Sequence, residues 1–341
     1  MPPNKQEVRE MKAPLVRVIN LRKYFPIKLG FIQSLLARRT IYVRAVDGVS
    51  FEVGHGEIFG LVGESGCGKT TTGRCTLLLE RPTTGHIYFK NIDLVELHEE
   101  DLSRLRRKMQ IIFQDPYESL NPRMSIYDIV TEPLHLQNVV ESEEEAEERA
   151  KEMLEEMGLV PPEEFLFRFP HELSGGQRQR VAIARAFILK PEFIVADEPV
   201  SMLDASIRAE VTKLILHMVE KLHCGFLYIT HDIALAAYIC DRIGVMYLGK
   251  MVEVGPTENL VKNPRHPYTQ ALINAVPVPD PTIKRGEIVI KGEVPNPINP
   301  PPGCRFHPRC PYAMDVCRKE EPKLIEVEKG HKVACHLISK K

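Results

Sequence analysis

Short apolar runs alternate with longer amphipathic stretches along most of this chain of 341 residues. The runs at 58–62, 193–196 and 226–230 have the length and composition of buried strands in a parallel sheet. Helices are predicted after two of them, from Thr71 onward and over 207–222. This order of strands and helices predicts an α/β fold.

Other segments predict a second set of elements. Residues 16–21, 43–46, 49–53 and 86–89 are expected to be strands, with a turn at Asp47-Gly48, and 243–247 and 250–254 are expected to form a hairpin. A charged helix is predicted at 102–108, another at 142–157 before Gly158, and a third opening at Ser174. The apolar residues within 29–40 favour a surface loop over an amphipathic helix. Residues 115–170 are expected to be mostly helical and separate from the strands.

The composition of the chain changes near its C-terminal end. Prolines become frequent after Asn263, which puts a domain boundary near Pro256. A loop-rich unit of this size buries little apolar surface and needs a covalent or metal staple. Four of the chain's 8 cysteines lie here, spaced C-x5-C-x6-C-x17-C: Cys304, Cys310, Cys317 and Cys335.

Charge and hydropathy exclude several classes of protein. The formal net charge of −1 gives no reason to expect nucleic acid as a partner. No apolar run approaches the roughly 18 residues of a membrane-spanning helix, and the N-terminus lacks the apolar core of a signal peptide. We therefore expect a cytoplasmic protein that contacts membranes only through a partner. In that compartment the cysteine group favours a metal site over disulfides.

One motif dominates the chemistry of the sequence. The stretch between the strand at 58–62 and the following helix fits the phosphate-binding pattern G-x-x-x-x-G-K-[ST]. Its residues are Gly63, Glu64, Ser65, Gly66, Cys67, Gly68, Lys69 and Thr70. Backbone N–H groups and the helix N-terminus would bind phosphate oxygens. Lys69 would reach the β- and γ-phosphates, and Thr70 would bind Mg²⁺.

A further strand is predicted at 109–114. Polar residues end this strand and others, where ligands bind in open parallel sheets. Asp197 would hold Mg²⁺ through water, and Gln114 would complete the Mg²⁺ shell. Glu198 would orient or deprotonate the attacking water, and His231 would contact the γ-phosphate. Each of these could be an ordinary loop residue if taken alone; their order along one chain favours phosphoryl transfer.

With these residues in place, the sequence resembles the nucleotide-binding subunits of ATP-binding cassette (ABC) transporters. The signature is matched by Leu173, Ser174, Gly175, Gly176 and Gln177, and the D-loop by Ser201, Met202, Leu203 and Asp204, with Met202 where Ala is common. The resemblance implies an ABC-type P-loop core at 13–256, with a mixed sheet, an antiparallel β-subdomain and a helical subdomain at about 115–172. It also implies a head-to-tail dimer with two ATP molecules in its interface, and an aromatic that stacks on adenine, Phe25 or else Tyr24.

The resemblance gives a full set of site residues. The expected catalytic residues are Glu198 and His231, and the Mg²⁺ ligands are Thr70, Gln114 and Asp197. The residues expected to bind ATP are Phe25, Gly63, Glu64, Ser65, Gly66, Cys67, Gly68, Lys69, Thr70, Thr71, Gln114, Ser174, Gly175, Gly176, Gln177, Asp197 and Asp204.

The tail at 257–341 resembles the C-terminal extension of the oligopeptide/dipeptide importer branch. The resemblance rests on the stretches at 265–272 and 303–311. The cysteine spacing alone leaves Zn²⁺ and an iron–sulfur cluster open, whereas the resemblance implies a [4Fe–4S] cluster on the four tail cysteines. His307, His331 and His336 are alternative ligands, although surface histidines are the default expectation.

The branch implies an ATPase that powers peptide import, bound to the cytoplasmic face of the cell membrane. Its partners would be two permease subunits, a second ATP-binding subunit (a paralogue or another copy) and, indirectly, an extracytoplasmic solute-binding protein. The permease is expected to dock near the 117–124 loop and the turn before Tyr127. Alternatives are the same architecture importing oligosaccharides or nickel, an ABC ATPase not involved in transport, and a metal-binding regulatory protein.

Overall fold

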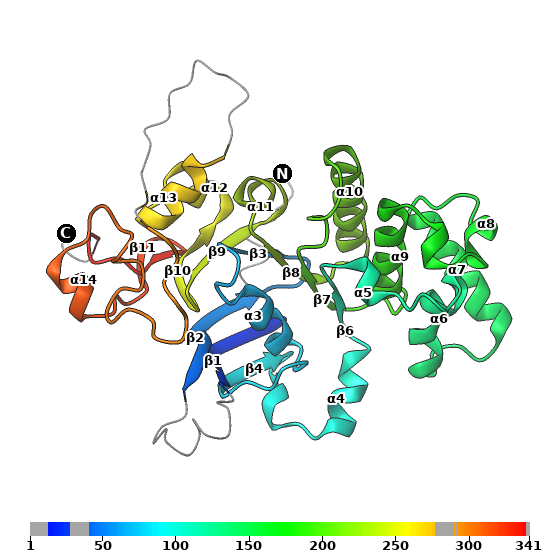
Figure 1. Ribbon diagram of the computed structural model, residues 1–341. Helices are drawn as coiled ribbons and strands as arrows, with labels where there is room; N and C mark the ends of the chain where they lie inside the picture. The colour runs from blue at the N-terminus through cyan, green and yellow to red at the C-terminus, as the bar shows by residue number, and fades with distance from the viewer. Residues whose placement is uncertain (1–12, 28–40, 277–289, 291, 339–341) are drawn as a thin grey trace, which may run out of the picture. The chain divides into compact units, whose positions relative to one another are not determined.

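The computed structural model describes residues 13–27, 41–276, 290 and 292–338 (Figure 1). The chain divides into two compact units. The first contains residues 53–57 and 96–228 together with the described residues up to Val16. The second contains residues 17–52, 58–95 and those from Ile229 onward.

The second unit carries an antiparallel sheet in the strand order β2-β1-β4-β5. These strands are β1 (Val16–Pro26), β2 (Tyr42–Val53), β4 (Thr84–Phe89) and β5 (Ile92–Asp93). The predicted turn at Asp47-Gly48 is wrong, because β2 runs unbroken through both residues. Gly48 has a φ of +87°, which a glycine can adopt inside the strand without strain. The surface loop predicted at 29–40 lies wholly outside the described residues.

A second sheet in this unit supports the phosphate loop. Strand β3 (Ile58–Val62) pairs in parallel with β9 (Arg242–Tyr247), and β9 forms the predicted hairpin with β10 (Lys250–Pro256). The tail extends this sheet through β12 (His331–Val333), which pairs with β10, and β11 (Ile325–Glu328). Within its described residues, the unit has the helices α3 (Lys69–Thr76), α11 (Ile233–Ile239), α12 (Thr257–Lys262), α13 (Pro267–Asn274) and α14 (Asp315–Lys319). The short tail strands were not predicted from the sequence.

The first unit has parallel strands of its own. Strand β6 (Met109–Ile112) pairs in parallel with β7 (Phe193–Asp197), so that Ile112 lies opposite Ala196. Strand β8 (Gly225–Thr230), most of which belongs to this unit, is the other neighbour of β7. Helices α9 (Gly175–Phe187) and α10 (Ala205–Leu222) follow their sequence predictions closely, whereas α4 (Glu99–Arg106) begins before the predicted 102–108.

Residues 115–172 are mostly helical, as expected. They form α5 (Pro116–Ser119), α6 (Ile126–Leu136), α7 (Glu143–Glu156), α8 (Glu163–Leu166) and the 3₁₀ turn η2 (Pro170–Glu172). Ser142 is the N-cap of α7, and its hydroxyl accepts the Glu145 N–H. Ala146 and Ala150 of this helix are fully buried. Figure 1 shows α6, α7 and α8 in green beside α9. Helix α6 contacts α7, α8 and α9.

Candidate functional site

The phosphate loop needs glycine at two positions for steric reasons. A Cβ on Gly63 would lie 2.3 Å from the Met246 carbonyl oxygen. A Cβ on Gly68 would lie 2.1 Å from the Ala45 carbonyl oxygen, and its φ is +103°. The backbones of β9 and β2 therefore leave no room for a side chain at Gly63 and Gly68. The two glycines let the loop curve between β3 and α3 against the backbone of β2 and β9.

Lys69 and Cys67 are both buried in this loop. The Lys69 ammonium donates to the carbonyl oxygens of Gly63 at 2.7 Å and Glu64 at 3.1 Å. Burial raises the pKa of the Cys67 thiol, which therefore stays neutral although Lys69 is near. The Cys67 thiol is thus a packing group. Ser65 and Gly66, by contrast, are exposed at the tip of the loop.

Two predicted residues meet in the first unit. The Gln114 amide nitrogen lies 3.4 Å from a Glu198 carboxylate oxygen, because β6 and β7 run in parallel and end at the same edge. Asp197 is buried at the last position of β7. Glu198 follows it with a φ of +46°. A non-glycine residue pays on the order of 1 kcal/mol or more for such a backbone, and such strain is common at functional sites.

The signature residues form the N-terminus of α9. Ser174 is the N-cap: its hydroxyl accepts the Gln177 N–H at 3.3 Å, and the Gln177 side chain accepts the Ser174 N–H at 2.9 Å. This capping box confirms the predicted helix start. Gly175 and Gly176 follow, and a Cβ on Gly175 would meet nothing within 4 Å. Asp204 of the D-loop occupies the N-cap position of α10.

The first unit also contains a pocket of about 230 Å³, and one of its lining residues is Phe113, which precedes Gln114 in the chain. Its apolar lining includes Phe113 and Leu136, and Leu136 is 72% exposed. An ion pair of 2.7 Å between Glu132 and Arg185 lines it as well. The predicted docking residue Tyr117 has another partner, since Arg178 of α9 donates to its hydroxyl at 2.6 Å.

His231 and the predicted adenine-stacking residues belong to the second unit. His231 is exposed and directly precedes Asp232, the N-cap of α11. Tyr24 and Phe25 end β1 and are both partly buried. The Tyr24 hydroxyl donates to Asp47 at 2.5 Å, while the Lys23 ammonium lies 4.8 Å from the centre of the Phe25 ring. The predicted residues are therefore shared between both units.

The four tail cysteines are free thiols that lie close together in the second unit. The Cys304 N–H donates to the Cys317 carbonyl at 2.8 Å. Burial raises the pKa of Cys304 to about 12, and the charges of Cys317, Cys335 and Cys310 add to the increase. Burial, with the charges of Cys310 and Cys317, raises the pKa of Cys335 to about 11. Each thiol is thus within electrostatic range of the others.

The expectation of surface histidines is wrong for His331. It is fully buried, and its Nε2 is 2.7 Å from Glu253, which is also fully buried. His307 and His336 use ring nitrogens for backbone carbonyls, those of Cys304 and Glu320.

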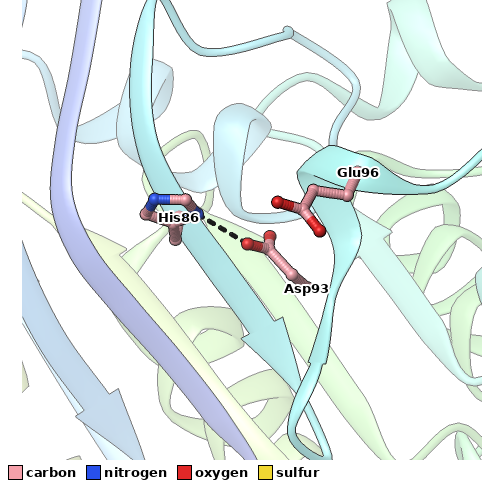
Figure 2. Close-up of side chains that lie close together, drawn as sticks. All are labelled: His86, Asp93 and Glu96. Carbon is pink, nitrogen blue, oxygen red and sulfur yellow. Dashed lines mark hydrogen bonds and ion pairs between the residues drawn. The ribbon is translucent and has the colours of Figure 1, made fainter.

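One further set of potential metal ligands lies outside the predicted site. Figure 2 shows His86, Asp93 and Glu96, whose ligand atoms lie within 4.8 Å of one another. It is the single group of this kind among the described parts of the chain. His86 Nδ1 already hydrogen-bonds Asp93 at 2.6 Å, and His86 and Glu96 are exposed, which fits an ordinary surface ion pair.

Comparison with known proteins agrees with this geometry. Residues 46–201 match the family model described as ABC transporter, and residues 252–317 match the one described as oligopeptide/dipeptide transporter, C-terminal region. An ATP-binding cassette solved as a dimer in a post-hydrolysis state with ADP and Pi is 31% identical, with a TM-score of 0.62, over 71% of this chain and 98% of its own. The fold and the site thus define an ABC ATPase, with the predicted mixed sheet and antiparallel β-subdomain.

Full-length relatives narrow the assignment. An oligopeptide transport ATP-binding protein of Bacillus subtilis is 48% identical over 95% of this chain and 98% of the relative. A dipeptide transport ATP-binding protein of Haemophilus influenzae is 45% identical over 97% and 99%. The chain belongs to this family: it is the ATP-binding subunit of an oligopeptide/dipeptide ABC importer, an ATPase coupled to peptide transport. Among its described helices, none is long and apolar enough to cross a membrane.

Proposed function

We propose that ATP binds between the P-loop of one subunit and the signature helix of another, with the residue roles expected from the sequence. Residues 63–71 bind the phosphates, Phe25 or Tyr24 stacks on adenine, and His231 contacts the γ-phosphate. The ATP molecule bound by the partner subunit's P-loop is contacted by Ser174, Gly175, Gly176, Gln177 and Asp204. The capping box at Ser174 supports this role, because it orients the first N–H groups of α9 outward from an exposed helix end.

The contact between Gln114 and Glu198 carries the proposal for catalysis. Glu198 acts as the base or water-positioning group, while Gln114, Asp197 and Thr70 complete the Mg²⁺ shell. Gln114 is then the link through which movement of residues 115–172 reaches the reacting water, since it touches Glu198 directly.

A Glu198→Gln variant tests this assignment. We expect it to bind ATP normally, to hydrolyse it at least 100-fold more slowly, and to accumulate as an ATP-bound dimer, because only the base is lost. Gel filtration with ATP would detect the dimer. The matched control is Glu210→Gln, which removes an exposed carboxylate that pairs with Arg180 in the same unit. Wild-type turnover by the Glu198 variant in the assembled transporter would contradict the assignment.

Two permease subunits are the proposed partners, and the pocket lined by Phe113 and Leu136 supports a docking surface there. An apolar side chain from a permease loop would occupy this pocket, which the Glu132–Arg185 pair also lines. This pocket adjoins the predicted 117–124 loop. Since Tyr117 also anchors Arg178 of the signature helix, Leu136→Ser is a cleaner uncoupling variant than Tyr117→Ala.

Cross-linking tests the docking surface. Single cysteines at positions 117, 124 and 136 should cross-link to cytoplasmic loops of the permease, whereas a cysteine at exposed Tyr238 of α11 should not. Leu136→Ser should lower transport more than ATP hydrolysis, because the docking contact is lost while the ATP site is intact. Cross-links that form only from the tail would move the docking surface away from the pocket.

The tail cysteines are proposed to hold a [4Fe–4S] cluster. Zinc sites usually contain a close pair of cysteines spaced C-x2-4-C, which the spacing C-x5-C-x6-C-x17-C lacks. A cubane binds four thiolates, one on each iron. The spacing therefore supports the cluster over zinc, and the group would staple β12, α14 and the 304–310 loop.

Metal analysis tests this proposal. Protein purified without oxygen should contain about four irons and four sulfides per chain. Cys310→Ser should lose them, whereas Cys224→Ser, which alters a buried cysteine elsewhere, should keep them. Stoichiometric zinc without iron would reject the cluster.

The chain is further proposed to have two domains and to act at the membrane. The ATPase domain spans 13–256 and the extension 257–341, supported by the separate family matches at 46–201 and 252–317. The protein acts at the cytoplasmic face of the membrane, with a second ATP-binding subunit and, through the permease, a solute-binding protein.

A further inference from the structure

Two residues of the tail hold the second residue of the P-loop. The Glu64 backbone N–H donates to the Tyr268 hydroxyl at 2.9 Å. The Glu64 carboxylate accepts a hydrogen bond from Arg309 Nη1 at 2.8 Å. Its carbonyl oxygen accepts from Lys69 at 3.1 Å. Every polar group of Glu64 thus has a partner, and two of these partners come from sequence beyond residue 256.

The two tail groups are themselves rigidly packed. Tyr268 is fully buried, with its ring edge-on to Tyr247 at 4.8 Å and tilted against Phe306 at 5.4 Å. The Arg309 guanidinium lies 5.8 Å from the centre of the Tyr247 ring, and its side chain is only 11% exposed. The packing leaves neither group free to move away, so that Glu64 is held against a preformed surface.

Glu64 also presents an electrostatic problem that Arg309 solves. The P-loop binds a polyanion, yet it carries a carboxylate at its second position. A unit negative charge about 10 Å from Mg-ATP, which carries two net negative charges, weakens binding roughly four- to sixteenfold at an effective dielectric between 80 and 40. An ion pair with Arg309 offsets this repulsion. The benefit should grow with the charge of the nucleotide and shrink as salt screens it.

We propose that Arg309 and Tyr268 are positioning residues of the ATP site, through which the tail sets nucleotide affinity. Arg309 neutralises the charge of Glu64, and Tyr268 fixes its N–H. A second contact reaches the same site from the same loop: Arg305 binds the Asp47 carboxylate, which in turn holds the Tyr24 hydroxyl. The tail is thus built into the nucleotide site of its own chain.

A double-mutant cycle tests the role of Arg309. Binding of Mg-ATP and Mg-ADP to the full-length chain would be measured by calorimetry at low and high salt. Arg309→Gln should raise the Kd for Mg-ATP, with its two net negative charges, about four- to sixteenfold, and that for Mg-ADP, with one, about two- to fourfold. High salt should reduce the difference. Adding Glu64→Gln to Arg309→Gln should restore ATP affinity to within about twofold of wild type, because no charge is then left unpaired.

Three further variants separate positioning from structural damage. Arg309→Lys keeps the charge and should retain most of the ATP affinity. Tyr268→Phe removes only the hydroxyl and should raise the KM for ATP about threefold without lowering kcat. Arg265→Gln is the matched control: it breaks an exposed 2.6 Å pair with Glu328 in the same tail and should leave ATP binding unchanged.

Equal losses for Mg-ATP and Mg-ADP, or a double variant that recovers no affinity, would show that Arg309 serves only the fold of the tail. Wild-type ATP affinity in Arg309→Gln and Tyr268→Phe, with circular dichroism showing both folded, would reject any link between the tail and the P-loop.

Discussion

Acid is expected to loosen the tail through one buried histidine. His266 is 1% exposed and is the N-cap of α13, where its Nδ1 accepts the Tyr268 N–H at 3.1 Å. That bond requires a neutral ring with its proton on Nε2. Burial lowers the pKa of His266 from 6.5 to about 4, although the charge of Glu253 opposes the shift. Protonation would therefore break the cap and charge a buried ring.

The size of the effect follows from the shift. Moving the pKa from 6.5 to about 4 corresponds to roughly 3 kcal/mol of tail stability in all. Because the folded state has the lower pKa, it binds fewer protons than the unfolded state. The stability is thus fully present above pH 6.5 and is lost as the pH falls toward 4. Between pH 7.5 and 5 the expected loss is about 2 kcal/mol.

Hydrogen exchange of the α13 amides, corrected for the intrinsic rate at each pH, would measure this loss. His266→Asn keeps a capping oxygen without a titrating ring, and its pH dependence should be flatter by the same 2 kcal/mol or so. Glu253 accepts hydrogen bonds from the N–H groups of Arg265 and His266 and contacts the ring of His331, and the variant keeps all three contacts. Equal pH slopes in wild type and variant would refute the reasoning.

Three other outcomes are expected. Gly68→Ala should abolish ATP binding in a calorimetric titration and destabilise the chain by more than about 2 kcal/mol, because its Cβ would overlap the Ala45 carbonyl. Gly66→Ala should be milder, because a Cβ there meets nothing within 4 Å and only the strain of its φ of +76°, about 1 kcal/mol, remains. Ser174→Ala should cost about 1 kcal/mol in denaturant unfolding through loss of the α9 cap, whereas Ser174→Asp should not. If the tail holds the proposed cluster, a chelator that removes it should increase proteolysis around 304–335 and leave α7 protected, since the two segments belong to different units.

Local geometry made much of this protein predictable. The P-loop needs a strand, glycines and a helix N-terminus within about ten residues, and the structure has β3, Gly63, Gly68 and α3 in that order. Ser174 and Gln177 form a capping box from their spacing alone. The meeting of Gln114 and Glu198 was also foreseeable, because parallel strands end at one edge.

Tertiary structure decided how the tail joins the rest of its unit. Proline-rich sequence indicated loops, yet residues 331–333 pair with β10, and the buried Glu253 draws His331 inward. Arg309 and Glu64 are 245 residues apart, and Tyr268 and Glu64 are 204 apart. Periodicity reports only which face of an element is buried, so it contains no information on which distant partner covers that face. The motif therefore defined the ATP site, while packing across these separations determined which tail side chains contact its Glu64.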